Sequence, residues 1–98
     1  MDPDEPTGPE GGEPIELPIT DILDLHGFQP RDVADVVRDY LDVAYARGLR
    51  RLRIIHGRGV GVQRQTVRTL LARDARVIAF GDAPLEAGGW GATWVELR

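Results

Sequence analysis

The chain has 98 residues, no cysteine and a formal net charge of −4. A chain of this length forms one small domain with a modest core. The lack of cysteine excludes a disulfide framework and a thiolate metal site. No apolar run approaches the roughly 20 residues of a membrane helix, and the first residues do not have the pattern of a secretory signal. We therefore expect a cytoplasmic protein with no membrane partner.

The charge is unevenly distributed along the chain. Residues 1–19 hold six acidic residues and no basic one, whereas residues 20–98 hold twelve arginines against ten acidic residues. The body of the protein is therefore mildly basic. Residues 1–14, "MDPDEPTGPEGGEP", are rich in proline, glycine and acid and predict a disordered tail. The domain itself is predicted over residues 15–98.

The first half of the domain is predicted to form a strand, a helix and a second strand. "DILDL" at residues 21–25 and "RLRII" at residues 51–55 have the composition of strands. Between them, Pro30 suits the first turn of a helix and Gly48 suits its end. Apolar residues recur on one face of this helix: Val33, Val36, Val37, Tyr40, Leu41 and Ala44.

The second half is predicted to form a helix and two more strands. The helix covers residues 61–74, with Val67, Leu70 and Leu71 facing inward. Strands follow at residues 76–80 and 90–97, separated by a loop over residues 81–89. In the last strand we expect Trp94, Val95 and Leu97 to pack.

These elements predict an α/β fold, a two-layer sandwich in the order β-α-β-α-β-β. Helices between strands make parallel crossovers, and two helices can cover only one face of a four-stranded sheet. The short last connection makes the fourth strand antiparallel, so the sheet is mostly parallel but mixed. The sequence leaves open whether the first two strands are neighbours.

Both histidines of the chain follow predicted strands. His26 follows the first strand and His56 the second, so both belong on the edge where parallel strands end and where ligands bind. Asp24 lies two residues before His26, so both side chains point to the same side of the sheet, either the face away from the helices or the rim. For each residue alone, a structural role at a strand end is the alternative.

"HGRGVG" at residues 56–61 places three glycines between a strand and a helix. Gly57, Gly59 and Gly61 allow close backbone approach, and a helix start offers free amides to an anion. The pattern is neither a Walker A loop nor a dinucleotide fingerprint. A tight turn without a ligand is the alternative.

Arginines surround this loop. Arg58 lies within it, and Arg64 and Arg68 follow one helical turn apart. This basic patch suggests a phosphodiester backbone as the partner, although each arginine alone could belong to a solvated helix face. Trp90, in the glycine-rich "GGWG" loop, could stack on a base or close the edge of the core.

Three motifs together resemble the small MutS-related (Smr) domain family: "LDLHG", "IHGRGVG" and "GGWGATWVEL". The resemblance covers about residues 15–98. Because the domain nearly fills the chain, the arrangement is similar to that of the stand-alone bacterial members. It implies a two-layer α/β sandwich, nucleic-acid binding and, in several members, nicking or cleavage of DNA or RNA. The family's Asp-Leu-His motif falls on Asp24, Leu25 and His26, and its His-Gly-x-Gly motif begins at His56.

Two positions depart from the commoner family pattern. Arg58 stands where lysine is usual, and Val60 where a small polar residue is usual. The first keeps the charge, and the second removes a possible hydroxyl donor to phosphate.

The first hypothesis for function is an endonuclease. Asp24 would act as general base or hold a divalent cation, Mg or Mn. His26 would be the second acid or base. His56 would contact phosphate or protonate the leaving oxygen, and the amides of residues 57–61 with Arg58 would stabilise phosphate charge. The residues imply no certain cofactor, and a metal remains open.

Two alternatives remain. The same basic loop could form a non-catalytic module that binds DNA, structured RNA or the ribosome. A binder of a small anionic ligand such as a nucleotide is a third reading. The sequence does not indicate an oligomeric state.

Overall fold

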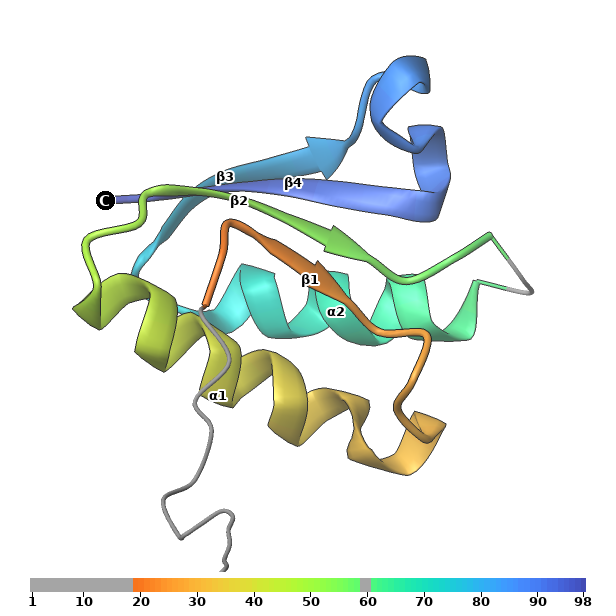
Figure 1. Ribbon diagram of the computed structural model, residues 1–98, viewed down its shortest axis with the longest axis horizontal. Helices are drawn as coiled ribbons and strands as arrows, with labels where there is room; N and C mark the ends of the chain where they lie inside the picture. Colours follow the sequence, from red (N-terminus) through yellow and green to blue (C-terminus); the bar gives the residue numbers. More distant parts are fainter. Residues whose placement is uncertain (1–18, 59–60) are drawn as a thin grey trace, which may run out of the picture.

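The computed structural model describes residues 19–58 and 61–98 (Figure 1). It consists of one four-stranded sheet with two long helices packed on the same face. This arrangement confirms the predicted two-layer α/β sandwich. The predicted tail, residues 1–14, lies outside the described residues. The elements in chain order are β1 (Ile22–Asp24), η1 (Pro30–Asp32), α1 (Val33–Ala46), β2 (Arg51–Ile55), α2 (Val62–Arg73), β3 (Val77–Asp82), η2 (Leu85–Ala87), η3 (Gly89–Gly91) and β4 (Ala92–Leu97).

The strand order in the sheet is β1-β2-β4-β3. β1 pairs in parallel with β2, and β4 runs antiparallel to both of its neighbours, β2 and β3. Three of the four strands therefore run in one direction, which confirms the mixed sheet and the antiparallel last strand. Because β1, β2 and β3 share a direction, their carboxyl ends meet at one rim of the sheet.

α1 forms because its apolar residues share one face. Val33, Val37 and Tyr40 are buried on that face, whereas Val36 is only partly buried. Pro30 opens a separate 3-10 turn, so α1 itself begins at Val33, later than Pro30 suggested. Gly48 ends the helix with a φ of +85°, a conformation that glycine adopts at little cost.

The core lies between the helices and the sheet. Five buried side chains from both layers belong to it. They are Leu25, which follows β1, Leu52 and Ile54 of β2, and Val67 and Leu71 of α2. Each such side chain stabilises the fold by about 1.5–3 kcal/mol relative to leaving it exposed.

One packing expectation for the last strand is wrong. Val95 and Leu97 are buried, but Trp94 points to the opposite face of β4 and is 38% exposed. The cause is the alternation of side chains along a strand. The indole of Trp94 lies over Gly81 on β3, so close that a Cβ at Gly81 would be 3.0 Å from the indole Nε1.

The connection between β3 and β4 differs from the predicted loop. β3 continues to Asp82, two residues beyond its predicted end, and β4 begins at Ala92 instead of residue 90. Two 3-10 turns, η2 and η3, fill the space between them. Gly88 joins the turns with a φ of +118°. No helix among the described residues has the length and apolarity that crossing a membrane requires.

Candidate functional site

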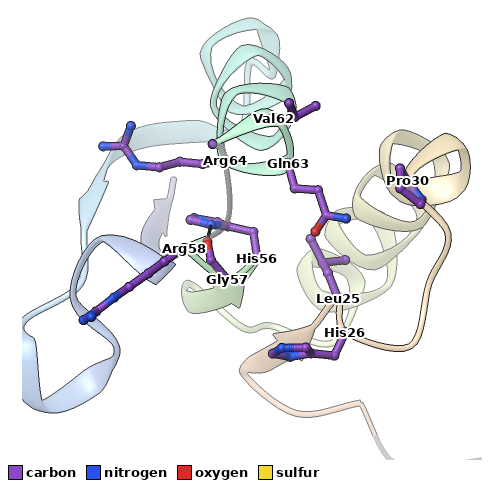
Figure 2. Close-up of a pocket in the computed structure, with 10 residues that line it drawn as sticks. Leu25, His26, Pro30, His56, Gly57, Arg58, Val62, Gln63 and Arg64 are labelled. Carbon is purple, nitrogen blue, oxygen red and sulfur yellow. Dashed lines mark hydrogen bonds between the residues drawn. The ribbon is translucent and has the colours of Figure 1, made fainter.

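A pocket of about 600 Å³ opens at the rim where β1 and β2 end (Figure 2). His26 and His56 both line it, together with residues from the start of α2. The two strands are neighbours, and the Leu25 amide donates to the Ile55 carbonyl at 2.9 Å just beyond β1. This pairing answers the question that the sequence left open and brings both histidines to one cavity.

Asp24 and His26 form a hydrogen-bonded pair on this rim. Oδ1 of Asp24 lies 2.9 Å from the backbone nitrogen of His26 and 2.9 Å from its Nδ1. The backbone amide of His26, followed by its ring, lowers the pKa of Asp24 below the ordinary value, so the carboxylate is ionised and accepts both bonds. The Nδ1 of His26 therefore carries a proton, which leaves Nε2 as the acceptor of a neutral ring. The His26 side chain is 75% exposed.

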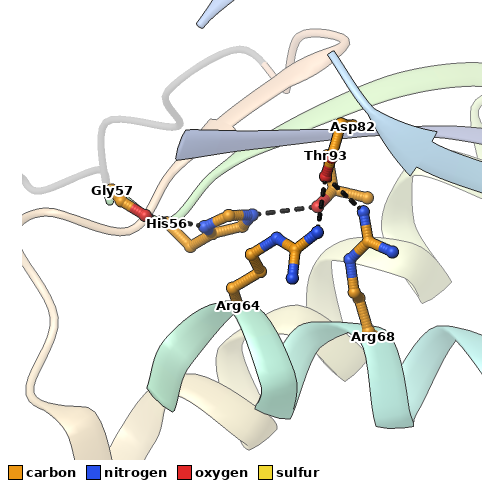
Figure 3. A network of polar contacts seen from close by, with 6 residues as sticks. All are labelled: His56, Gly57, Arg64, Arg68, Asp82 and Thr93. Atoms are coloured by element: carbon orange, nitrogen blue, oxygen red, sulfur yellow. Dashed lines mark hydrogen bonds and ion pairs between the residues drawn. The ribbon is translucent and has the colours of Figure 1, made fainter. Parts of the chain in front are cut away.

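His56 is buried, and both of its ring nitrogens contact protein atoms (Figure 3). Nδ1 lies 2.9 Å from the Gly57 carbonyl and must donate to it, so Nε2, 2.9 Å from Oγ1 of Thr93, accepts from that hydroxyl. Burial lowers the pKa of His56; the bond to Gly57 opposes this effect, and the charges of Arg64 and Arg68 add to it. His56 is therefore neutral near pH 7, and neither nitrogen is free for a phosphate in this conformation.

The glycines after His56 have different environments. The amides of His56 and Gly57 both donate to the Gly91 carbonyl, at 3.1 and 2.9 Å, so the Gly57 amide is not available to an anion. Gly61 lines the pocket and precedes α2 with a φ of +84°. Gly59 lies outside the described residues.

The Arg58 side chain extends from the pocket across the glycine turn of η3. Its Nη2 donates to the Gly88 carbonyl at 3.5 Å. A Cβ at Gly89 would lie 2.9 Å from that same nitrogen, and a Cβ at Gly91 would lie 3.0 Å from Cγ of Arg58. The small residues of the "GGWG" segment therefore make room for Arg58, which is exposed.

Arg64 and Arg68 converge on one carboxylate (Figure 3). Nη2 of Arg64 lies 2.7 Å from Oδ1 of Asp82, and Nη2 of Arg68 contacts the same oxygen. The bond from Arg64 and the charges of both arginines lower the pKa of Asp82. The two arginine side chains are only 26% and 24% exposed. Arg64 lines the pocket, whereas Arg68 does not.

Trp90 lies on η3 beside this network. The Arg64 guanidinium carbon is 5.3 Å from the centre of the Trp90 ring, within the range of a cation–π contact. Trp90 is exposed and does not line the pocket. It is therefore a surface aromatic held next to an arginine, and it does not close the core.

The described residues, 19–58 and 61–98, contain no cluster of three or more His, Asp or Glu side chains that could hold a metal ion. Asp24 and His26 together would supply one carboxylate oxygen and one ring nitrogen. Any divalent cation here would need further ligands from the substrate or from water.

Sequence reasoning missed Asp82, Thr93 and Gln63. Asp82 ends β3, which points to the same rim as β1 and β2. Residues at the carboxyl ends of such strands meet at one rim, which is the signal that places Asp82 with the two histidines. Gln63, in the first turn of α2, lines the pocket, and Thr93 contacts His56.

Comparison with known proteins assigns this arrangement to a family. The family model described as the Smr domain matches residues 23–98, which include all three motifs of the sequence. The chain belongs to the Smr domain family. The resemblance stated from the motifs is confirmed.

Two curated relatives of this Smr domain are named endonuclease MutS2. The protein from Thermus thermophilus is 45% identical over 76 residues, and the one from Gemmatimonas aurantiaca is 39% identical over 87 residues. These matches cover 78% and 89% of this chain. The chain spans about 10% of the length of each relative.

Two crystal structures share the fold. The Smr domain of Thermus thermophilus MutS2 is 43% identical with a TM-score of 0.76, and the match covers 81% of this chain and 99% of that one. YdaL, a stand-alone small MutS-related protein from Escherichia coli, is 31% identical with a TM-score of 0.75. That match covers 80% of this chain and 64% of YdaL. These Smr proteins have the same α/β sandwich as this chain.

Proposed function

We propose that this Smr domain binds DNA or structured RNA at the rim of the sheet and cleaves a phosphodiester bond there. The observation that carries the proposal is the exposed His26, whose ring is held by Asp24 at the mouth of a pocket. The names of the MutS2 endonuclease relatives support the same class of activity.

In this proposal His26 is the general base. Because its Nδ1 proton is held by Asp24, Nε2 can take a proton from a hydroxyl placed in the pocket. With RNA, the 2′-oxygen then attacks the adjacent phosphorus and the 5′-oxygen leaves, giving a cyclic phosphate. With DNA, a water molecule is the nucleophile, and a cation such as Mg or Mn would assist by neutralising charge. Asp24 then acts through His26 or contributes one ligand.

The roles of Arg58 and His56 follow from whether each side chain is exposed to a substrate or already bonded to protein atoms. The exposed guanidinium of Arg58 would stabilise charge on the phosphate. His56 has both nitrogens occupied, so we assign it the structural task of fixing the Gly57 turn beside the pocket. The leaving oxygen takes its proton from protonated His26 or from water.

A cleavage assay tests this proposal. Purified protein is incubated with intact supercoiled plasmid DNA, in which a nick can be detected, and with a structured RNA. Each reaction is run with and without a chelator. Cleavage by the wild type should fall at least 100-fold in His26→Ala and Asp24→Ala, the scale of lost acid–base catalysis. Asp39→Ala, an exposed aspartate on α1, is the matched control and should cleave normally. Cleavage that survives both His26→Ala and Asp24→Ala contradicts the assignment.

The second candidate is a binding module without catalysis, which could dock on structured RNA or on the ribosome. The observation that favours it is the exposed Arg58 beside the Trp90–Arg64 pair. These three side chains can hold nucleic acid without help from Asp24 and His26. In this case Asp24→Ala leaves affinity unchanged or raised, and no substrate is cleaved by the wild type.

A further inference from the structure

The rim pocket has two unlike sides. Toward β2, it is bounded by His56, Gly57 and Arg58, and toward α1 by Leu25 and Pro30. Val62, at the start of α2, adds to the apolar side and is 61% exposed. In Figure 2 the guanidiniums of Arg58 and Arg64 lie across His56 from Pro30 and Leu25. The basic groups and the apolar side are therefore separated by His56.

A phosphate backbone alone does not account for the apolar side. Phosphates need cations, which Arg58 and Arg64 supply on the basic side, and they gain nothing from Leu25 or Pro30. A cavity of about 600 Å³ is within the range that holds a small planar ligand. A nucleobase has apolar faces and polar edges, and it remains attached to the phosphate beside it.

Gln63 supplies a polar group for the edge of such a base. It lines the pocket from the first turn of α2, and its side chain extends toward Leu25 in Figure 2. A glutamine amide both donates and accepts hydrogen bonds, so it can pair with the edge of a base that is not already paired. This group lies on the apolar side, away from the two guanidiniums.

We propose that the pocket takes the base of an unpaired nucleotide, with Pro30 and Val62 against the base and Gln63 at its edge. The inference rests on the proposed function and deepens it, because it defines the substrate as nucleic acid with an unpaired or easily unpaired nucleotide. The phosphate attached to that base then lies beside His26, and the backbone continues toward Arg58. A fully paired base is a poorer substrate because extruding it costs stacking and pairing energy.

Fluorescence tests this directly. The probe is 2-aminopurine, placed either as a single-nucleotide bulge or paired within the same hairpin, made as DNA and as RNA. We expect at least a two-fold change in fluorescence when wild type binds the bulge and little change at the paired position. Val62→Phe narrows the pocket at an exposed site and should abolish most of this change. Gln65→Phe places the same ring on an exposed position of α2 outside the pocket and is the control.

Gln63→Ala gives a second measurement that does not depend on filling the pocket. With the four natural bases in turn at the bulge, wild type should show a spread of affinities, and the variant should bring them to within two-fold of one another. The inference is overturned if wild type binds the bulged hairpin without a fluorescence change, or if Val62→Phe and Gln65→Phe respond alike.

The two proposals fail in different ways. Equal cleavage of bulged and paired hairpins with no fluorescence change leaves the nuclease proposal standing and overturns the pocket inference. A fluorescence change that Val62→Phe abolishes, with no cleavage under any condition, supports the pocket and overturns the catalytic role. Absence of binding to every hairpin overturns both.

Discussion

The hydroxyl of Thr93 lies 2.9 Å from Nε2 of His56 and satisfies the ring nitrogen that the Gly57 carbonyl does not reach. Thr93 is fully buried in β4, and His56 directly follows β2, so this bond joins two neighbouring strands at the rim. The Gly57 carbonyl fixes the ring as the Nδ1–H tautomer, so the Thr93 hydroxyl donates to Nε2. The rigidity of the turn at Gly57 therefore depends on a residue that sequence reasoning treated only as part of a strand.

Thr93→Val should destabilise the protein. The valine keeps the volume and shape of threonine but leaves Nε2 of His56 buried without a donor, which costs about 1–3 kcal/mol. Urea unfolding followed by circular dichroism measures this loss. Thr93→Ser retains the hydroxyl and should recover the hydrogen bond, although it loses a buried methyl group. An unfolding free energy for Thr93→Val equal to that of wild type would show that the hydrogen bond contributes nothing.

The stability of the protein should fall between pH 7.5 and pH 5 because of His56. Burial lowers the pKa of His56 from its ordinary value of 6.5, so below that pH the unfolded chain binds a proton that the folded chain resists. Stability is full above pH 6.5 and is lost as the pH falls toward the lowered value. The lowered pKa values of Asp24 and Asp82 act in a separate window, below their ordinary 3.8.

Thermal unfolding at pH 7.5, 6.5 and 5 checks this expectation. The His56→Gln variant should show a smaller loss of melting temperature over the range, whatever its absolute stability. If His56→Gln and wild type lose the same number of degrees, the buried ring is not the group responsible.

The elements of the fold follow from periodicity in the sequence, whereas the position of β4 does not. Alternation and the apolar stripe of α1 identify strands and helices locally, because each pattern depends on neighbouring residues. The placement of β4 between β2 and β3 depends on long-range pairing. The segment from residue 83 to 91 is long enough to reach either edge, so the sequence alone leaves the order open.

The candidate site was predicted in its motifs but not in its electrostatics. Asp24, His26 and His56 reach one rim because they end parallel strands, a consequence of topology. The pairing of Arg64 and Arg68 with Asp82 does not follow from the basic pattern, which predicts only a solvated helix face or a phosphate ligand for these arginines. A signal was present: each arginine precedes a buried residue of α2, Val67 or Leu71, by three positions, which places it beside the buried stripe.

Gly88→Ala should destabilise the turn between η2 and η3. Gly88 has a φ of +118°, and a Cβ there would lie 2.9 Å from Cβ of Ala92, which cannot move aside easily. Backbone strain of this kind costs about 1–3 kcal/mol. Gly27→Ala is the matched control, because its φ is ordinary and a Cβ at that position has no neighbour within 4 Å. Chemical denaturation should separate the two variants clearly, and equal stabilities would contradict the strain assigned to Gly88.

The arginines around the pocket should contribute unequally to nucleic-acid binding. Arg58 is exposed, and within residues 19–58 and 61–98 the hydrogen bond of its guanidinium is a long one, 3.5 Å to the Gly88 carbonyl, so it can turn to a phosphate at little cost. Arg68 is 24% exposed, lies outside the pocket and is held by Asp82. Arg58→Ala should therefore reduce the slope of log affinity against log salt concentration by about 0.7–0.9, the loss of one phosphate contact.

Arg68→Ala should change that slope by much less, and its main effect should be on the position of Asp82. Fluorescence anisotropy with a labelled duplex and a labelled single strand, titrated at several salt concentrations, measures both slopes. Arg73→Ala, in the last turn of α2, removes an exposed arginine far from the rim and controls for the general loss of charge. Equal slopes for Arg58→Ala and Arg73→Ala would mean that the rim holds no phosphate at Arg58. A larger effect from Arg68→Ala than from Arg58→Ala would place the backbone over the Asp82 network instead.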